Sequence, residues 1–135
     1  MLRFDGLKRI SVNSGEPVTL ATAKAHLRVS SSTEDGLIGS YIKAAREFCE
    51  IYCHRSFVAC QWNLSLSEFP SGHLSLPMGP VSNITDFYYH DDAGNRLNVE
   101  GCHTDLNGRI ALLGRPDQGW PFVTDRPGRI IVNFT

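Results

Sequence analysis

Hydrophobic residues recur at helical spacing through the first part of the chain. The segment from Thr19 to about Val29 places Thr19 at an N-cap position and repeats apolar residues every three or four positions, which predicts a first helix. The residues before Pro17 are interpreted as a short lead. A polar joint over residues 30–33 separates this helix from a second one, whose first turn holds Glu34 and Asp35.

The second helix is predicted from the strongest periodicity in the sequence. Its apolar positions form one broad stripe, made of Leu37, Ile38, Tyr41, Ile42, Ala45, Phe48, Cys49 and Tyr52. Charged residues lie opposite, and the pairs Lys43–Glu47 and Arg46–Glu50 have the i,i+4 spacing that is typical of a solvated face. The width of the stripe predicts that this helix is a main element of the core.

From Phe57 onward the hydrophobic residues alternate with polar ones, which indicates strands. The clearest alternation covers residues 58–67, and shorter extended segments follow up to a last strand over residues 129–134. Asn107-Gly108 favours a tight hairpin turn. No long crossover follows residue 56, so the sheet is expected to be mainly antiparallel. The predicted fold class is α+β, with two N-terminal helices packed against a mainly antiparallel β-meander.

Length and charge narrow the possible functions. The chain has 135 residues, which supports a single domain over 1–135 with a helical part (17–56) and a β-rich part (57–135). Lys and Arg number 13 against 14 Asp and Glu, giving a formal net charge of −1. This balance disfavours dedicated binding to duplex DNA. We expect no secretory signal and no membrane span, and therefore reduced thiols.

Cysteine and histidine residues raise the question of a metal or thiol site. They are Cys49, Cys53, His54, Cys60, Cys102 and His103. Because Cys49 and Cys53 are one helical turn apart on the apolar stripe, and Cys60 faces inward on its strand, these three are expected to be core residues. The run His90-Asp91-Asp92 is interpreted as a hairpin turn rather than a cation site. No catalytic, metal or cofactor-binding residue is therefore predicted.

Aromatic residues occur in two places where binding is conceivable. Residues 87–89 are Phe-Tyr-Tyr, but acidic neighbours favour packing within the sheet over stacking on bases. The loop over residues 114–128 is long for a compact domain and carries residue types that dominate protein interfaces. Its interface candidates are Arg115, Trp120, Phe122 and Arg126. The alternative, that Trp120 folds back to close one end of the sheet, is equally favoured and compatible.

Several short stretches occur in an order that matches a known family. They are Pro17–Leu20, Ala23–Arg28, Asp35–Ile38, Ala44–Phe48, Gln61-Trp62, Leu76-Pro77, Pro80-Val81, Ile84-Thr85, Gly119–Pro121, Arg126-Pro127 and Ile131–Thr135. In this arrangement the chain resembles the phage head–tail connector (adaptor) family, in the branch with a β-rich insertion. Two departures are visible. Cys53-His54 stands where the family has a small residue or glycine, and the family's C-terminal helices have no counterpart after Thr135.

The resemblance implies a structural virion protein of the neck, assembled in the host cytoplasm, with no enzymatic activity, cofactor or membrane contact. Its copies are expected to form a dodecameric ring below the portal protein. This homo-oligomer would extend the DNA channel, with DNA only passing through, and give a tail-completion or stopper protein its attachment site. Closing such a ring requires two different faces on each subunit. We expect the two-helix unit to supply one, and the Trp120 loop or a sheet edge the other.

Two other interpretations remain open on the residues alone. One is a small monomeric interaction module unrelated to phage. The other, least favoured, is a small metal or thiol protein that uses Cys49, Cys53 and His54.

Overall fold

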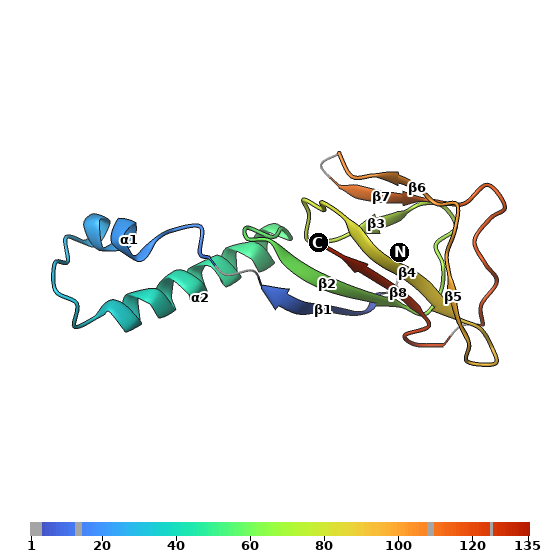
Figure 1. Ribbon diagram of the computed structural model, residues 1–135, viewed down its shortest axis with the longest axis horizontal. Helices are drawn as coiled ribbons and strands as arrows, with labels where there is room; N and C mark the ends of the chain where they lie inside the picture. The colour runs from blue at the N-terminus through green and yellow to red at the C-terminus, as the bar shows by residue number, and fades with distance from the viewer. Residues whose placement is uncertain (1–3, 13–14, 108–109, 125) are drawn as a thin grey trace.

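Two antiparallel sheets and a pair of helices make up the part of the chain that the structure, a computed structural model, describes: residues 4–12, 15–107, 110–124 and 126–135 (Figure 1). The helices are α1 (Leu20–Leu27) and α2 (Asp35–Cys53). The strands are β1 (Phe4–Val12), β2 (Cys60–Leu66), β3 (Leu74–Leu76), β4 (Ile84–His90), β5 (Arg96–Asn98), β6 (His103–Asp105), β7 (Ala111–Gly114) and β8 (Ile130–Phe134). The α+β class and the antiparallel pairing are as predicted.

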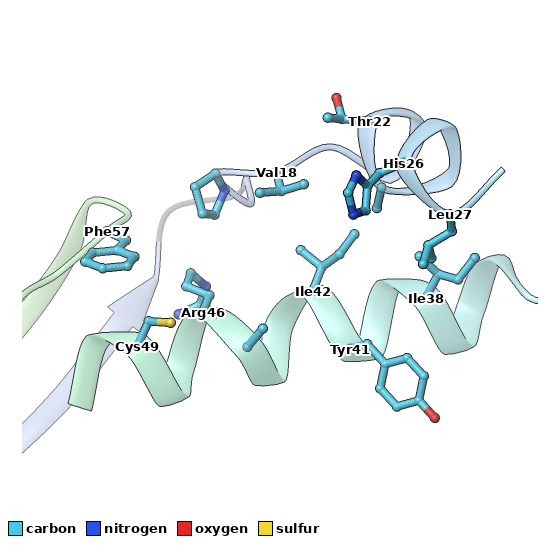
Figure 2. Close-up of a pocket in the computed structure, with 13 residues that line it drawn as sticks. Val18, Thr22, His26, Leu27, Ile38, Tyr41, Ile42, Arg46, Cys49 and Phe57 are labelled. Atoms are coloured by element: carbon cyan, nitrogen blue, oxygen red, sulfur yellow. The ribbon is translucent and has the colours of Figure 1, made fainter. Parts of the chain in front are cut away.

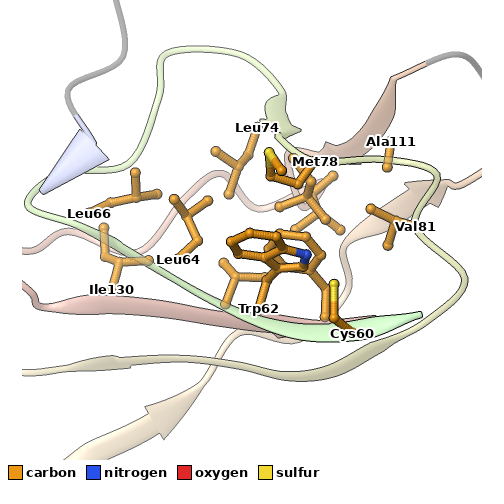
Figure 3. Close-up of a cluster of buried hydrophobic side chains, with 13 residues drawn as sticks. Cys60, Trp62, Leu64, Leu66, Leu74, Met78, Val81, Ala111 and Ile130 are labelled. Atoms are coloured by element: carbon orange, nitrogen blue, oxygen red, sulfur yellow. The ribbon is translucent and has the colours of Figure 1, made fainter. Parts of the chain in front are cut away.

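The core lies between the two sheets. One sheet has the strand order β1-β2-β8-β4-β5 and the other the order β3-β7-β6. Inward-facing residues alternate along β2 and β8, as the sequence pattern predicts, and pack against residues of the smaller sheet (Figure 3). The main members are Trp62, Leu64, Leu66, Leu74, Leu76, Leu113, Ile130, Val132 and Phe134.

The interpretation of the N-terminal residues as a lead is wrong, because β1 occupies residues 4–12. It pairs antiparallel with β2 from Phe4 opposite Leu66 to Val12 opposite Cys60. The pairing shifts register between Arg9 and Ser11, and β1 lies at the edge of the sheet. An irregular edge strand buries little, so its sequence shows no clear alternation. The helices are consequently inserted between two neighbouring strands.

The helices form an arm that extends from one end of the sheets (Figure 1). Within it α1 packs along α2. The expected packing of the helices over a sheet is therefore not what the structure shows, and the prediction that α2 is a main core element is wrong. Of the apolar stripe on α2, only Ile38 is buried. Periodicity identifies an apolar face, but it does not say what covers that face.

Helix ends follow the expected chemistry in part. Thr19 caps α1 and accepts the backbone N–H of Thr22 at 3.1 Å, as predicted. Strands β6 and β7 pair as the expected hairpin, but Gly108 of the Asn107-Gly108 turn lies outside the described residues. No helix in the described ranges is long and apolar enough to cross a membrane.

Candidate interaction surfaces

Paired charges hold the base of the arm against the sheets. Glu50 of α2 is fully buried, and its Oε2 atom accepts hydrogen bonds from Arg9 of β1 and from Arg46, both at 2.7 Å. Its Oε1 atom accepts the backbone N–H of Phe57 at 2.8 Å. Arg46 is also buried and donates to Glu16, ahead of α1, at 2.7 Å. This charge network joins β1, both ends of the helical segment and the chain entering β2.

The charge network shifts the pKa values of its two buried members, Glu50 and Arg46. Burial by itself raises the pKa of Glu50, but the hydrogen bonds from Phe57 and Arg9, with the charges around them, outweigh burial and leave that pKa below its usual value. The hydrogen bond to Glu16 is the largest influence on Arg46 and raises its pKa. The prediction that Arg46 and Glu50 form a solvated pair is wrong. The i,i+4 spacing does not distinguish an exposed pair from a buried one. Arg9, which binds Glu50, is distant in sequence, so the pattern of α2 does not reveal it.

The outward face of α2 carries a row of exposed apolar residues, four of them large, with nothing packed on it in the described chain. The row, here called the exposed seam, consists of Leu37, Tyr41, Ala44, Phe48 and Ile51. Phe48 is 70% exposed and stacks with Tyr52, whose exposed fraction is 78%, at a ring separation of 6.4 Å. Contiguous apolar surface of this kind marks interaction sites in soluble proteins.

Beside the exposed seam lies an apolar groove between α1 and α2, with a volume of about 560 Å³. Val18 and His26 point into it from the α1 side, and Ile42 rises from α2 (Figure 2). Tyr41 of the exposed seam also lines the groove, at its border, with its ring directed away from α1. Cys49 and Phe57 line the end nearest the sheets. This arm groove and the exposed seam are two adjacent apolar surfaces on one helix pair.

The two aromatic interface candidates of the loop over residues 114–128 have different environments. Trp120 folds back: it stacks on Phe69 with ring centroids 5.1 Å apart, and its indole N–H donates to the carbonyl oxygen of Gly72 at 2.8 Å. Phe122, two residues on, is 90% exposed. The loop therefore presents one aromatic side chain from a base anchored by another.

The two arginines of the loop interact with residues other than Phe122. The guanidinium of Arg115 lies against Gly119, where an added Cβ atom would be 2.8 Å from Nη2. Arg126 is exposed, and its charge helps to lower the pKa of Asp92, after the larger effects of hydrogen bonds from Thr124 and Arg129. Nothing in the structure joins all four loop residues into one site.

The residues considered for metal or thiol chemistry do not converge. Cys60 is buried as expected, but the core placement of Cys49 and Cys53 is wrong, because both lie exposed on the uncovered helix. Within the ranges that the structure describes, no three His, Cys, Asp or Glu side chains gather closely enough to hold a metal ion.

The other two candidate segments have structural roles. The carboxylate of Asp91 accepts the backbone N–H of Asn95 at 2.8 Å, so the run from His90 forms a turn as predicted. Phe87 and Tyr89 pack against the core, which confirms the packing interpretation of the aromatic run.

The charge network and the exposed seam are the features that the sequence interpretation missed. A signal for the seam exists, since its members follow one another at spacings of four and three residues, the repeat of a helix-packing face. The charge network has no comparable signal, because three of its partners come from separate segments.

Comparisons with known proteins give a consistent result. The family described as "Phage gp6-like head-tail connector protein" matches residues 17–85, which is half of the chain. A chain in the neck of an empty gene transfer agent particle, computed with C6 symmetry, aligns with a TM-score of 0.81 at 23% identity, over 96% of this chain and 70% of that one. A chain in the neck of the native particle, computed with C12 symmetry, aligns with a TM-score of 0.75 at 22% identity, over 96% and 68%. At these identities the structural matches establish the fold. No curated protein matches the sequence.

Proposed function

Because this chain belongs to the phage gp6-like head-tail connector family, we propose that its copies form a ring in the neck of a phage-like particle, below the portal protein. The ring extends the channel through which DNA passes and offers a tail-completion or stopper protein its attachment site. Membership of this family makes the chain a structural connector rather than an enzyme.

The observation that carries the proposal is the apolar surface of the arm. Phe48, Ile51 and Tyr52 each expose more than half of their surface although they belong to the longest helix in the described chain. Water contact with such side chains costs roughly 25 cal/mol per Å² of apolar surface, so covering them favours assembly. A subunit of a larger assembly accounts for this surface, and a protein that remains monomeric does not.

The symmetry of similar structures and the charge of the chain support the same account. Two of the structurally similar chains lie in necks that were computed with C6 and C12 symmetry. The formal net charge of −1 suits a channel that DNA must traverse, since few phosphates are neutralised and the DNA is not held.

We propose that the loop contacts a neighbouring protein of the neck, with Phe122 as the inserted side chain. Trp120 acts through its packing, which fixes the loop, and Arg115 and Arg126 are proposed as further contact residues of the same loop. An aromatic side chain presented from an ordered loop loses little conformational entropy on binding.

The first experiment measures the native mass of the protein alone and with its cognate portal by mass photometry. We expect a closed ring alone, or about twelve copies on the portal, by analogy with the C12 neck. A monomer that does not bind the portal contradicts the proposal and favours an unrelated interaction module.

In the same assay Phe122→Ala tests the loop. This variant is expected to weaken binding to the portal without changing the free energy of unfolding. Ile110→Ala, which also truncates an exposed apolar residue but lies outside the loop, is the matched control.

A further inference from the structure

The exposed seam has the geometry of a helix-packing face. Its five members lie at spacings of four, three, four and three residues along α2, which places them on one line of the helix. The line spans about 21 Å at 1.5 Å per residue. It contains two aromatic residues and no charged one, which is the composition of the centre of a protein interface. Ala44 in the middle lets another backbone approach closely.

The arm groove provides a surface of similar length and the same chemistry. It runs along α2 from Ile38 to Cys49, about 16 Å by the rise of the helix. Its walls carry Val18 and His26 on one side and Ile42 on the other (Figure 2). An apolar groove between two helices accepts the apolar face of a third helix.

The described chain itself offers a helix of the required kind. Only α2 has an exposed apolar seam of several turns among the described elements, since α1 has eight residues. The seam and the groove share Tyr41 at their border, but the other four seam residues lie outside the lining of the groove, so a helix seated in the groove leaves most of the seam accessible. This is the condition for a heterologous contact, which repeats from copy to copy until a ring closes.

We propose that the exposed seam of one copy packs into the arm groove of a second copy, so that the arms form the contact between neighbours in the ring. The inference rests on the proposed function and deepens it by naming the two surfaces that meet. It differs from the expectation that the Trp120 loop or a sheet edge supplies the second face. The charge network around Glu50 supports the contact, because it fixes the arm relative to the sheets before neighbours meet.

The test uses one variant on each surface. Phe48→Glu places a charge in the seam and Val18→Glu places one in the groove, both at positions that are already exposed, so the fold tolerates them. Each variant alone is expected to lose the assembled species. A mixture of the two is expected to form a heterodimer of about twice the 15.0 kDa monomer mass, because the intact groove of Phe48→Glu accepts the intact seam of Val18→Glu. The remaining surfaces are blocked, so growth stops there.

Ile110→Glu is the matched control, since it introduces the same charge in place of an exposed apolar residue that belongs neither to the arm nor to the 114–128 loop. It is expected to self-assemble like the unmodified chain. If the unmodified chain assembles only on the portal, the measurement is the number of copies that the portal binds. The mixture of the two arm variants is then expected to add one heterodimer to the portal.

Three results overturn the inference. Normal assembly of both arm variants removes the arm contact while leaving the connector function intact. Loss of assembly in a loop variant, Phe122→Glu, together with normal assembly of Val18→Glu assigns the second face to the loop. Two monomeric variants that do not combine when mixed show that the seam and the groove do not bind each other, whereas a seam-to-seam contact would leave Val18→Glu able to pair with itself. If the unmodified chain neither self-assembles nor binds the portal, the proposed function itself fails.

Discussion

At the scale of single residues, burial decides what a charged side chain contributes. An exposed Arg–Glu pair one helical turn apart contributes only about 0.3–0.5 kcal/mol. Arg46 and Glu50 have that spacing, but both are buried, and Glu50 serves two arginines and a backbone N–H at once. Removing one member of such a group leaves the others buried without their partner, which costs far more than the exposed pair is worth.

Replacing Glu50 by Gln is therefore expected to lower the free energy of unfolding by about 3–5 kcal/mol, measured by urea denaturation at neutral pH. Glu68→Gln, at an exposed position outside the charge network, is the control and is expected to change it by less than about 0.5 kcal/mol. A loss as small as the control's contradicts a structural role for the charge network.

The pH dependence of stability follows from the same carboxylate. Since the pKa of Glu50 is lowered in the folded protein, its contribution is complete above the pKa of the unfolded chain and disappears as the pH falls through the lowered value. Glu50→Gln should consequently lose less stability on acidification than the unmodified chain.

At the scale of elements, the end of α2 contains a conformation that a glycine would adopt more easily. His54 has φ of 51°, in the left-handed region, where its backbone N–H donates to Ile51. An L-residue pays about 1–2 kcal/mol there, and glycine does not.

His54→Gly is expected to raise the free energy of unfolding by about 0.5–1 kcal/mol, because the relief of strain exceeds the greater chain entropy of glycine. Thermal denaturation measures the effect as a higher midpoint. His54→Ala keeps the Cβ atom and serves as the control, for which no stabilisation is expected. Equal midpoints for the two variants would show that the left-handed backbone does not limit stability.

At the scale of the whole molecule, the arm and the sheets differ in how they are stabilised. The sheets enclose a core in which Leu64, Ile130 and Val132 are fully buried, while α1 has no buried residue. Local opening requires less free energy where little apolar surface is buried. The arm thus depends on α1–α2 contacts, on the charge network and, in the proposed ring, on its neighbours.

Hydrogen exchange at a concentration where the chain is monomeric should show faster exchange in α1 than in β2 and β8. Assembly should then slow exchange in α1 and α2 and leave the sheets unchanged, because the arm is where we place the contact. Protection that increases in the 114–128 loop and not in the arm would argue against that placement.

The residue pattern was sufficient to predict the helices and strands that have a regular apolar face. Alternation in β2 and β8 reflects a strand with one buried face, and the helical repeats of α1 and α2 reflect their apolar stripes, so class, helix order and antiparallel pairing followed from the residues. The ordered short stretches indicated the family. These features depend on spacing along the chain, which a sequence displays directly.

Only the tertiary structure decided what each face meets. The stripe of α2 has the pattern of a core helix, yet the arm leaves it uncovered; Glu50 has the pattern of a surface residue, yet Arg9 of β1 closes over it. β1 was missed because an edge strand with a register shift buries too little to impose alternation. Periodicity records which side of an element is apolar, whereas burial depends on residues distant in sequence, and only folding brings those together.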